Sequence, residues 1–596
     1  MSTVTSLPVA AAGGSFLLED RRPEEVFTPE DFSEEHRQIA ATAAQFAREE
    51  IAPAAAAVEA KETGAVRGLL KKAGDLGFLS TDIPEEYGGL GMDKTSSAVI
   101  ADQLSVLASF STAFGAHVGI GTLPLVWFGT EEQKKKYLPK LAEAEWVAAY
   151  ALSEATSGSD AMNVRTRAVL SEDGKHYILN GEKMWITNGG IADLYTVFAK
   201  IDGEKFSAFL VERTFAGVTV GAEEHKLGIR GSSTCPLVLT DCRVPVENLL
   251  GEAGKGHHIA FNVLNVGRFK LGVACVGGAR YALGEMVRYA KERTAFGKAI
   301  AEFGLIQRKI STSAARLYAA ESMSYRTVGM IDAALSALDE SKAKEPREIQ
   351  KRIEEYAVEC SVLKVYASEA MGYVADELVA TMGGYGYVED YPAERVYRDA
   401  RINRIFEGTN EINRLIVTGW LMKRALKGEL PLLGAIKKLM DEVMAPPSFE
   451  DADGAGDVLA AEAEKLAAVR KMALFAAGVA SQKHMAALEQ QQEIMADLAD
   501  MITQVYALDS ALVRARKMGA KSGAAVARAM TGLIAEEALA VATEAAKRVL
   551  AACGAGDELR TQLAILRRLG KSTPADTVAL SRAVAGECVR LERYAL

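Results

Sequence analysis

The sequence predicts a mainly α-helical protein of several domains with an inserted β domain. Its 596 residues exceed what one hydrophobic core usually serves. Apolar residues recur at helical spacing toward both ends of the chain, whereas residues 147–256 hold short runs rich in Val, Tyr, Phe, Leu and Thr that are typical of strands. The expected order is therefore helices, strands, helices and a further helical region.

The first part of the chain predicts an arm followed by a helical domain. Residues 1–30 carry no basic residue before Arg21 and only a short apolar run, so they fit neither a secretion signal nor a membrane-spanning helix. We expect an arm that is flexible or docked on the surface. In residues 31–146, Ile39, Ala43 and Phe46 mark one helical face, and a turn-rich stretch at 83–93 separates the early helices.

The β domain is expected at residues 147–256. Asn180-Gly181 stands between two strand-like runs, which is a strong signal for a tight hairpin turn. Helical spacing returns in residues 257–444, with a charged break at 339–352 that we interpret as a helix–helix connection. Residues 445–456 combine prolines, acids and small residues, as a mobile linker does, and residues 457–596 predict a separate helical domain.

The amino-acid composition argues against two classes of function, nucleic-acid binding and metal binding. The net charge of −10 arises from acids and bases mixed along the chain, which argues against nucleic acid as a partner. Six cysteines lack CxxC spacing and the histidines show no HExxH pattern, so we expect no metal site and a reducing compartment. These observations predict a cytoplasmic protein.

Glu407 is the first candidate for chemistry, in the stretch RIFEGTNEI. It stands between Phe406 and Gly408, where apolar neighbours withhold water, raise the pKa of a carboxyl and make it a better base near neutral pH. The alternative is that the stretch only starts a helix, capped by Thr409 or Asn410. Capping explains residues 409–411 but leaves Glu407 without a role.

Each of three further sequence features could bind a ligand or could have only a structural role. The loop SEATSGSDAMN at 153–163 offers hydroxyl and backbone donors to a phosphate or a ring edge, although a surface loop has the same composition. Trp185 lies two residues before Thr187, which suits an aromatic cofactor but also suits a core. GGYGYV at 383–388 fits no P-loop or Rossmann motif and could be a simple turn.

Seven motifs follow one another along residues 32–428: PEEYGGLG, GTEEQKKKYLPKLA, SEATSGSD, GEKMWITNGG, ERTAFGK, MGGYGYVEDYP and YRDARINRIFEGTNEI. In this order they resemble the acyl-CoA dehydrogenase family, and within it the larger very-long-chain type with an extra C-terminal helical domain. The resemblance implies an N-terminal helical domain, a central β-barrel or sandwich and a C-terminal helical bundle.

The resemblance implies a non-covalently bound FAD and a homodimer. It places the adenosine end of FAD across the dimer interface, at Arg293, Phe296, Gly383 and Gly384. The remaining FAD contacts that it implies are Ser153, Ser159, Trp185, Thr187 and Thr409, and it places Ser159, Arg268 and Gly408 at the substrate. One family contact is missing, because Ala380 stands where relatives often carry glutamine.

The implied reaction is the α,β-dehydrogenation of a fatty acyl-CoA to trans-2-enoyl-CoA, the first step of β-oxidation. Glu407 matches the family's catalytic base. Some relatives carry that base immediately before an arginine on an earlier helix, but Gly267 precedes Arg268 here. The family usually passes its electrons to electron transfer flavoprotein.

Chain length and the extra domain are also predicted. Small residues at 109–121, including Thr112, Gly115 and Ala116, predict a deep pocket for long acyl chains, unless they serve only close helix packing. The extra domain is expected to stabilise the dimer, with peripheral membrane contact around Pro446 as a further expectation. An acyl-CoA oxidase and a scaffolding member of the family are the alternative functions.

Overall fold

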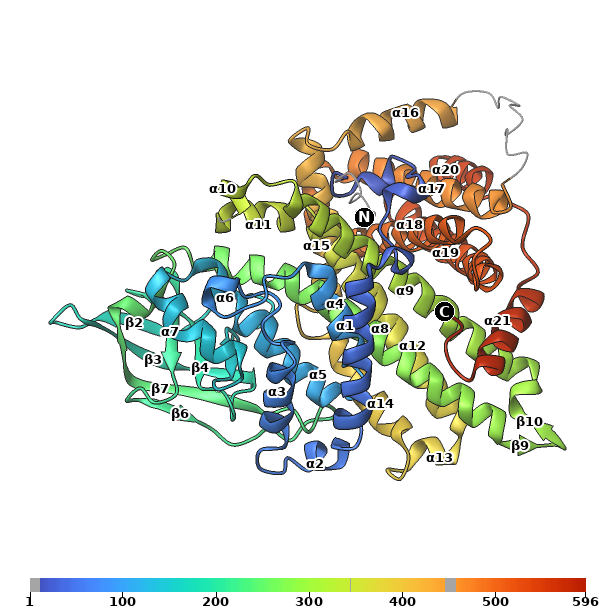
Figure 1. Cartoon of the computed structure of the whole chain (residues 1–596). Coiled ribbons are helices and arrows are strands. Elements are labelled where there is room, and N and C mark those ends of the chain that lie inside the picture. Colours follow the sequence, from blue (N-terminus) through green and yellow to red (C-terminus); the bar gives the residue numbers. More distant parts are fainter. Residues whose placement is uncertain (1–10, 344, 445–456) are drawn as a thin grey trace.

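The structure is a computed structural model that describes residues 11–343, 345–444 and 457–596 (Figure 1). The N-terminal helices follow their capping signals: Ser33 caps α1, Asp93 caps α4 and Thr130 caps α7, each side chain accepting a backbone N–H three residues on. The bounds are α1 (Glu34–Phe46), α2 (Ala55–Glu59), α3 (Ala65–Asp75), α4 (Lys94–Gln103), α5 (Ala108–Gly115), α6 (Leu123–Phe128) and α7 (Glu131–Ala142).

The β domain lies at one end of the molecule, on the left of Figure 1. Its main sheet has the order β6-β7-β3-β2-β4-β5-β8, and β1 pairs with β4 in parallel. The strands are β1 (Ala148–Ala151), β2 (Arg167–Leu170), β3 (His176–Thr187), β4 (Leu194–Ile201), β5 (Lys205–Glu212), β6 (Val218–Val220), β7 (Thr234–Pro245) and β8 (Leu249–Leu250).

The hairpin turn predicted at Asn180-Gly181 is wrong. Both residues lie inside β3, and the register against β7 shifts between Leu179 and Gly181. A Cβ at Gly181 would approach the side chain of Thr166, so the glycine serves a β-bulge and a close backbone approach. A dipeptide that favours a turn can equally mark a bulge within one long strand.

The C-terminal bundle is built around α8 (Gly256–Glu292), α9 (Gly304–Ser336), α12 (Ala357–Met382) and α15 (Asn410–Leu426). The charged break at 339–352 is itself largely helical. A short hairpin, β9 (Thr294–Ala295) and β10 (Lys298–Ala299), follows α8. The shorter helices are α10 (Glu340–Ala343), α11 (Pro346–Glu354), α13 (Gly384–Tyr387), α14 (Pro392–Ala400) and α16 (Leu432–Met444).

The extra helices form the additional helical region that the sequence predicts, and they pack directly onto this bundle. Both regions share one hydrophobic core cluster. Arg326 on α9 forms a buried salt bridge of 2.8 Å with Asp509, and Tyr318 donates a hydrogen bond to the Ala511 carbonyl. The added helices are α17 (Ala460–His484), α18 (Gln492–Met518), α19 (Ala524–Cys553), α20 (Gly556–Leu569) and α21 (Thr577–Leu591).

The described part of the arm is docked, and its apolar side chains are buried. Phe16 and Leu17 are buried in the core cluster. The Gly14 N–H donates to Glu359 on α12 at 2.6 Å, and Glu30 pairs with Arg514 on α18 at 2.9 Å. The predicted linker and the membrane contact expected around Pro446 lie outside the described residues.

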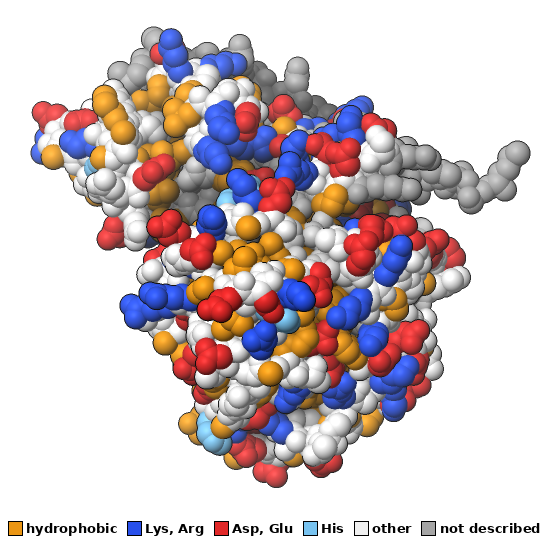
Figure 2. Space-filling view, turned by 90° about the vertical axis from the view of Figure 1, so that its left-hand side faces the viewer, with side chains coloured by type: hydrophobic (Ala, Val, Ile, Leu, Met, Phe, Trp, Pro, Cys, Tyr) orange, Lys and Arg blue, Asp and Glu red, His pale blue; other side chains and the backbone are white. Residues whose placement is uncertain are grey.

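Three features of the described residues complete the fold. Among the described helices, α8 is long and apolar enough to cross a bilayer, but most of that stretch is buried inside the protein. No cluster of metal-binding side chains occurs within the described ranges. On the face in Figure 2, acidic and basic side chains are interleaved.

Candidate active site

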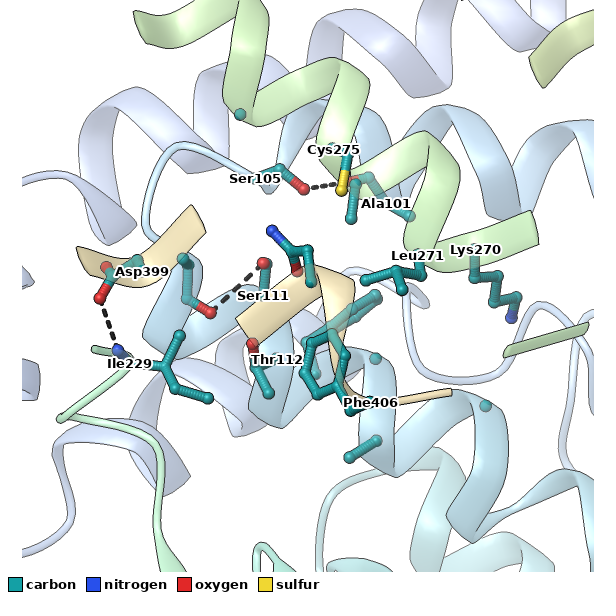
Figure 3. A pocket seen from close by; sticks show the side chains of 18 of the residues that line it. Ala101, Ser105, Ser111, Thr112, Ile229, Lys270, Leu271, Cys275, Asp399 and Phe406 are labelled. Carbon is teal, nitrogen blue, oxygen red and sulfur yellow. Dashed lines mark hydrogen bonds between the residues drawn. The ribbon is translucent and has the colours of Figure 1, made fainter. Parts of the chain in front are cut away.

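A cavity of about 1320 Å³, including its open mouth, lies where the N-terminal helices meet the bundle. Its walls come from α4, α5, α8 and α14, and Figure 3 shows Ser111, Thr112 and Leu271 around it. Glu407 and Phe406 line one part of the cavity, and Thr187 from the end of β3 lines the same space. The structure therefore places two predicted site residues, 220 positions apart in the sequence, around one cavity.

The Glu407 carboxylate is held in an apolar position. Its Oε2 is buried and has no hydrogen-bond partner among the described groups, although the residue as a whole is partly exposed. Burial raises the pKa of Glu407 to about 7, and the charges of Arg268 and Lys364 offset that rise only in part. Such a carboxyl can take up a proton near neutral pH.

The backbone around Glu407 is fixed by three polar side chains. Lys364 donates to the Gly408 carbonyl at 2.7 Å, Asn413 donates to the same carbonyl at 2.8 Å, and Arg268 approaches the Glu407 carbonyl at 3.4 Å. These contacts hold a turn that is strained at Glu407, whose φ is 58°, whereas Gly408 adopts its φ of 78° without strain. Arg268, predicted at the substrate, is turned toward this backbone.

Thr409 caps α15, as the helix-capping interpretation allowed. Its hydroxyl accepts the Ile412 N–H at 3.2 Å. Asn410 is not the cap: it is buried and accepts a hydrogen bond from Lys364 at 2.8 Å. The helix cap is Thr409, whereas the candidate base is Glu407. The two interpretations therefore concern different residues and do not exclude each other.

Two other predicted site residues share the left-handed backbone of Glu407. Trp185 has φ 57° and Phe296 has φ 51°, a region that large side chains rarely adopt. Trp185 is 56% exposed and Phe296 is 96% exposed, so neither is a core residue. Strained and exposed aromatic side chains are available for a ligand or a second subunit. Ser153 is half-buried and Ser159 is exposed in the loop before β2.

Another hollow, of about 890 Å³ including its open mouth, forms at the junction of α8, α12 and α13. Its lining includes Arg293, Gly383 and Gly384. The family resemblance predicts that these three residues belong to one binding region. Tyr289 donates a hydrogen bond to the Met382 carbonyl at 3.2 Å and supports this junction. Gly383 has φ 61°, which suits the turn that ends α12.

Sequence reasoning missed the groups that hold Glu407. Lys364 and Asn413 were not singled out, and neither belongs to a recognisable nucleotide or metal motif. A lysine inside the mostly apolar stretch at 360–367 was the available signal for Lys364, because a buried lysine needs polar partners. Asn413 gave no such signal, since it falls in the polar first turn of α15.

Three family models cover these regions in the order that the fold shows. They are described as "Acyl-CoA dehydrogenase, N-terminal domain" at residues 33–145, "middle domain" at 149–242 and "C-terminal domain" at 254–422. A further C-terminal domain model matches residues 468–568. The chain belongs to the acyl-CoA dehydrogenase family.

Similar proteins agree with this assignment. A "Probable acyl-CoA dehydrogenase" of Bacillus subtilis is 49% identical over 98% of both chains. The bovine mitochondrial "Very long-chain specific acyl-CoA dehydrogenase" is 39% identical over 63% of this chain and 57% of its own. A crystal structure of an acyl-CoA dehydrogenase complexed with FAD from Bacillus anthracis has 48% identity and a TM-score of 0.95, covering 98% of this chain and 100% of that one.

The residues present fit FAD, so this acyl-CoA dehydrogenase is an FAD enzyme. Trp185 has an exposed ring near the end of β3, and Thr187 at that end lines the cavity, which suits an aromatic cofactor with a polar edge. The buried Glu407 Oε2 lacks a protein partner, as expected of a group that meets a ligand. The comparisons do not favour the oxidase alternative.

Proposed function

We propose that this acyl-CoA dehydrogenase converts long-chain fatty acyl-CoA to trans-2-enoyl-CoA with Glu407 as its base. The observation that carries the proposal is a deep, mainly apolar cavity with one buried, unpartnered carboxylate in its wall. A thioester α-proton is weakly acidic, so its removal needs a desolvated base close to the carbon.

The chain's own groups explain the proton transfer. Glu407 takes the α-proton, and Phe406 beside it limits water in the cavity. The Glu407 N–H makes no backbone hydrogen bond within the described residues, so it can donate to a thioester oxygen on which negative charge develops. FAD, when bound, accepts the hydride that leaves the β-carbon.

The length of the cavity supports a long acyl chain. One stripe of α8 lines it, from Gly267 beside Glu407 through Leu271, Ala274 and Gly278 to Tyr281. Fourteen residues of α-helix span about 21 Å. An extended chain advances about 1.2 Å per bond, so the stripe accommodates a chain of roughly 17 bonds.

Substrate preference tests the chain-length proposal. We expect kcat/KM for palmitoyl-CoA to exceed that for butyryl-CoA. Equal or better activity on butyryl-CoA would show that the small residues of α5 serve helix packing only. A Glu407→Gln enzyme that kept its cellular role would instead favour the scaffolding alternative.

We also propose a homodimer, with electron transfer flavoprotein as the acceptor. The exposed Phe296 on the β9–β10 hairpin and the hollow at Arg293 and Gly383 support an FAD site completed by a second subunit. A matching chain, 36% identical over 66% of this one with a TM-score of 0.58, comes from a structure titled as the electron transferring flavoprotein of Acidaminococcus fermentans. Peroxide release during turnover would contradict this acceptor.

A further inference from the structure

A polar stripe runs along the cavity from Glu407 toward its far end. Arg395, Asp399, Asn403 and Glu407 recur at intervals of four residues, and all four line the cavity. The first two lie on α14 and the third on the 3-10 turn Arg401–Arg404 that follows. Spacing of four places Arg395 and Asp399 on one face of α14, and the lining of the cavity adds Asn403 and Glu407 to the same polar strip.

The far end of the cavity carries a guanidinium and a phenol. Arg395 on α14 and Tyr281 on α8 both line the space. Burial and the charge of Glu285 raise the pKa of Tyr281, and the charges of Arg395 and Arg288 oppose that rise. Burial raises the pKa of Asp399, and the charge of Arg395 also opposes that rise. The Arg395 guanidinium therefore lies near two groups that line the cavity, Tyr281 and Asp399.

At this end of the cavity, Arg395 forms no salt bridge with a described acidic residue. Its neighbour Arg398 pairs with Glu394 at 2.7 Å, whereas Arg395 forms no salt bridge within residues 11–343, 345–444 and 457–596. Asp399 accepts the Ile229 N–H and is turned toward that backbone, as Figure 3 shows. Both Arg395 and Tyr281 are partly exposed, so the guanidinium and the phenol at this end of the cavity are open to solvent.

We propose that this end is a subsite for an ω-carboxylate, so that the enzyme accepts long-chain ω-carboxyacyl-CoA thioesters. The proposal rests on the proposed function, because the thioester must lie at Glu407. A carboxylate at the end of a chain of about 16 carbons would reach Arg395 after the length of the α8 stripe. Charge-assisted hydrogen bonds from guanidinium and phenol would compensate its lost hydration.

Steady-state kinetics of the FAD-loaded enzyme test the subsite with palmitoyl-CoA and the monothioester of hexadecanedioic acid. We expect Arg395→Gln to lower kcat/KM for the dioic substrate by about tenfold or more, since hydrogen bonds to charged groups have that effect. Its kcat/KM for palmitoyl-CoA should change by less than about twofold. Arg395→Lys should recover part of the dioic activity, and Tyr281→Phe should lose less than Arg395→Gln.

Arg401→Gln is the matched control, because it removes an exposed arginine from the adjoining turn. It should leave both substrates unchanged. The subsite is refuted if the wild type prefers palmitoyl-CoA over the dioic substrate by more than about a hundredfold, or if Arg395→Gln affects both substrates equally. Failure to oxidise palmitoyl-CoA at all would refute the proposed function instead.

Discussion

A side chain at Gly267 would collide with Glu407. A Cβ built on Gly267 lies 2.5 Å from Oε2 of Glu407, well inside van der Waals contact. The two residues are 140 positions apart and belong to α8 and to the turn before α15. The glycine therefore leaves the space that the carboxylate occupies, and the position of that carboxylate depends on it.

Gly267→Ala should displace the Glu407 carboxylate and lower kcat by about a hundredfold, since small misplacements of a catalytic group have effects of that size. Gly284→Ala is the control on the same helix, because its Cβ would meet its nearest heavy atom at 3.6 Å, an ordinary contact. Stopped-flow reduction by palmitoyl-CoA measures both variants. Wild-type rates in Gly267→Ala would show that the base tolerates the displacement.

The pH dependence of kcat/KM should report the ionisation of Glu407. Burial raises its pKa to about 7, and only the ionised carboxylate can accept the α-proton, so activity should fall about tenfold per pH unit below 7. Asp399 is the other carboxyl that lines the cavity, and burial raises its pKa to about 6. Asp399→Asn is therefore the control that removes this second ionisation. The midpoint should stay near 7 in that variant. A midpoint near 4.5 would contradict a desolvated base.

Glu407→Gln should stabilise the FAD-loaded protein at pH 8. Because the folded protein holds the Glu407 proton more tightly than the unfolded chain does, raising the pH from 4.5 through 7 costs stability. From the shift between 4.5 and about 7, the difference in free energy of unfolding is at most about 3 kcal/mol. The difference in free energy of unfolding between Glu407→Gln and the wild type should vanish below pH 4.5. Denaturant titrations at pH 4.5 and pH 8 measure it, and an equal effect at both pH values would show that ionisation is not its cause.

Ala274→Phe should shorten the cavity. Ala274 lies seven residues beyond Gly267 on α8, about 10 Å along the helix, so a large side chain there should block long chains and leave room for short ones. We expect kcat/KM for palmitoyl-CoA to fall at least about tenfold while that for butyryl-CoA changes little. Thermal unfolding checks that the variant remains folded. An equal loss on both substrates would place the acyl chain elsewhere.

The sequence predicts the local features better than the long-range ones. Helical spacing and strand-like runs separate the domains in the right order, and the cap at Thr409 follows from its hydroxyl and position. The turn at Asn180-Gly181 is wrong because turn propensity does not reveal the β-bulge that the partner strand β7 creates. Packing of the extra helices on α9 also depends on complementary surfaces that one-dimensional spacing does not contain.

The candidate site shows the same division. Its apolar flanks single out Glu407 locally, but the space opposite Gly267 and the support from Lys364 depend on which helices meet. The polar stripe from Arg395 to Glu407 has the spacing of one helix face in the sequence. Only the structure shows that this face lines a cavity and that Tyr281 lies at its far end.

Anaerobic mixing of the FAD-loaded protein with palmitoyl-CoA tests the central claim most directly. The account predicts that the visible flavin absorbance bleaches in the wild type, and that Glu407→Gln binds FAD but bleaches at least about a thousandfold more slowly. Glu411→Gln, in the first turn of α15, should bleach like the wild type. Bleaching of Glu407→Gln at the wild-type rate would contradict the assignment of Glu407 as the base.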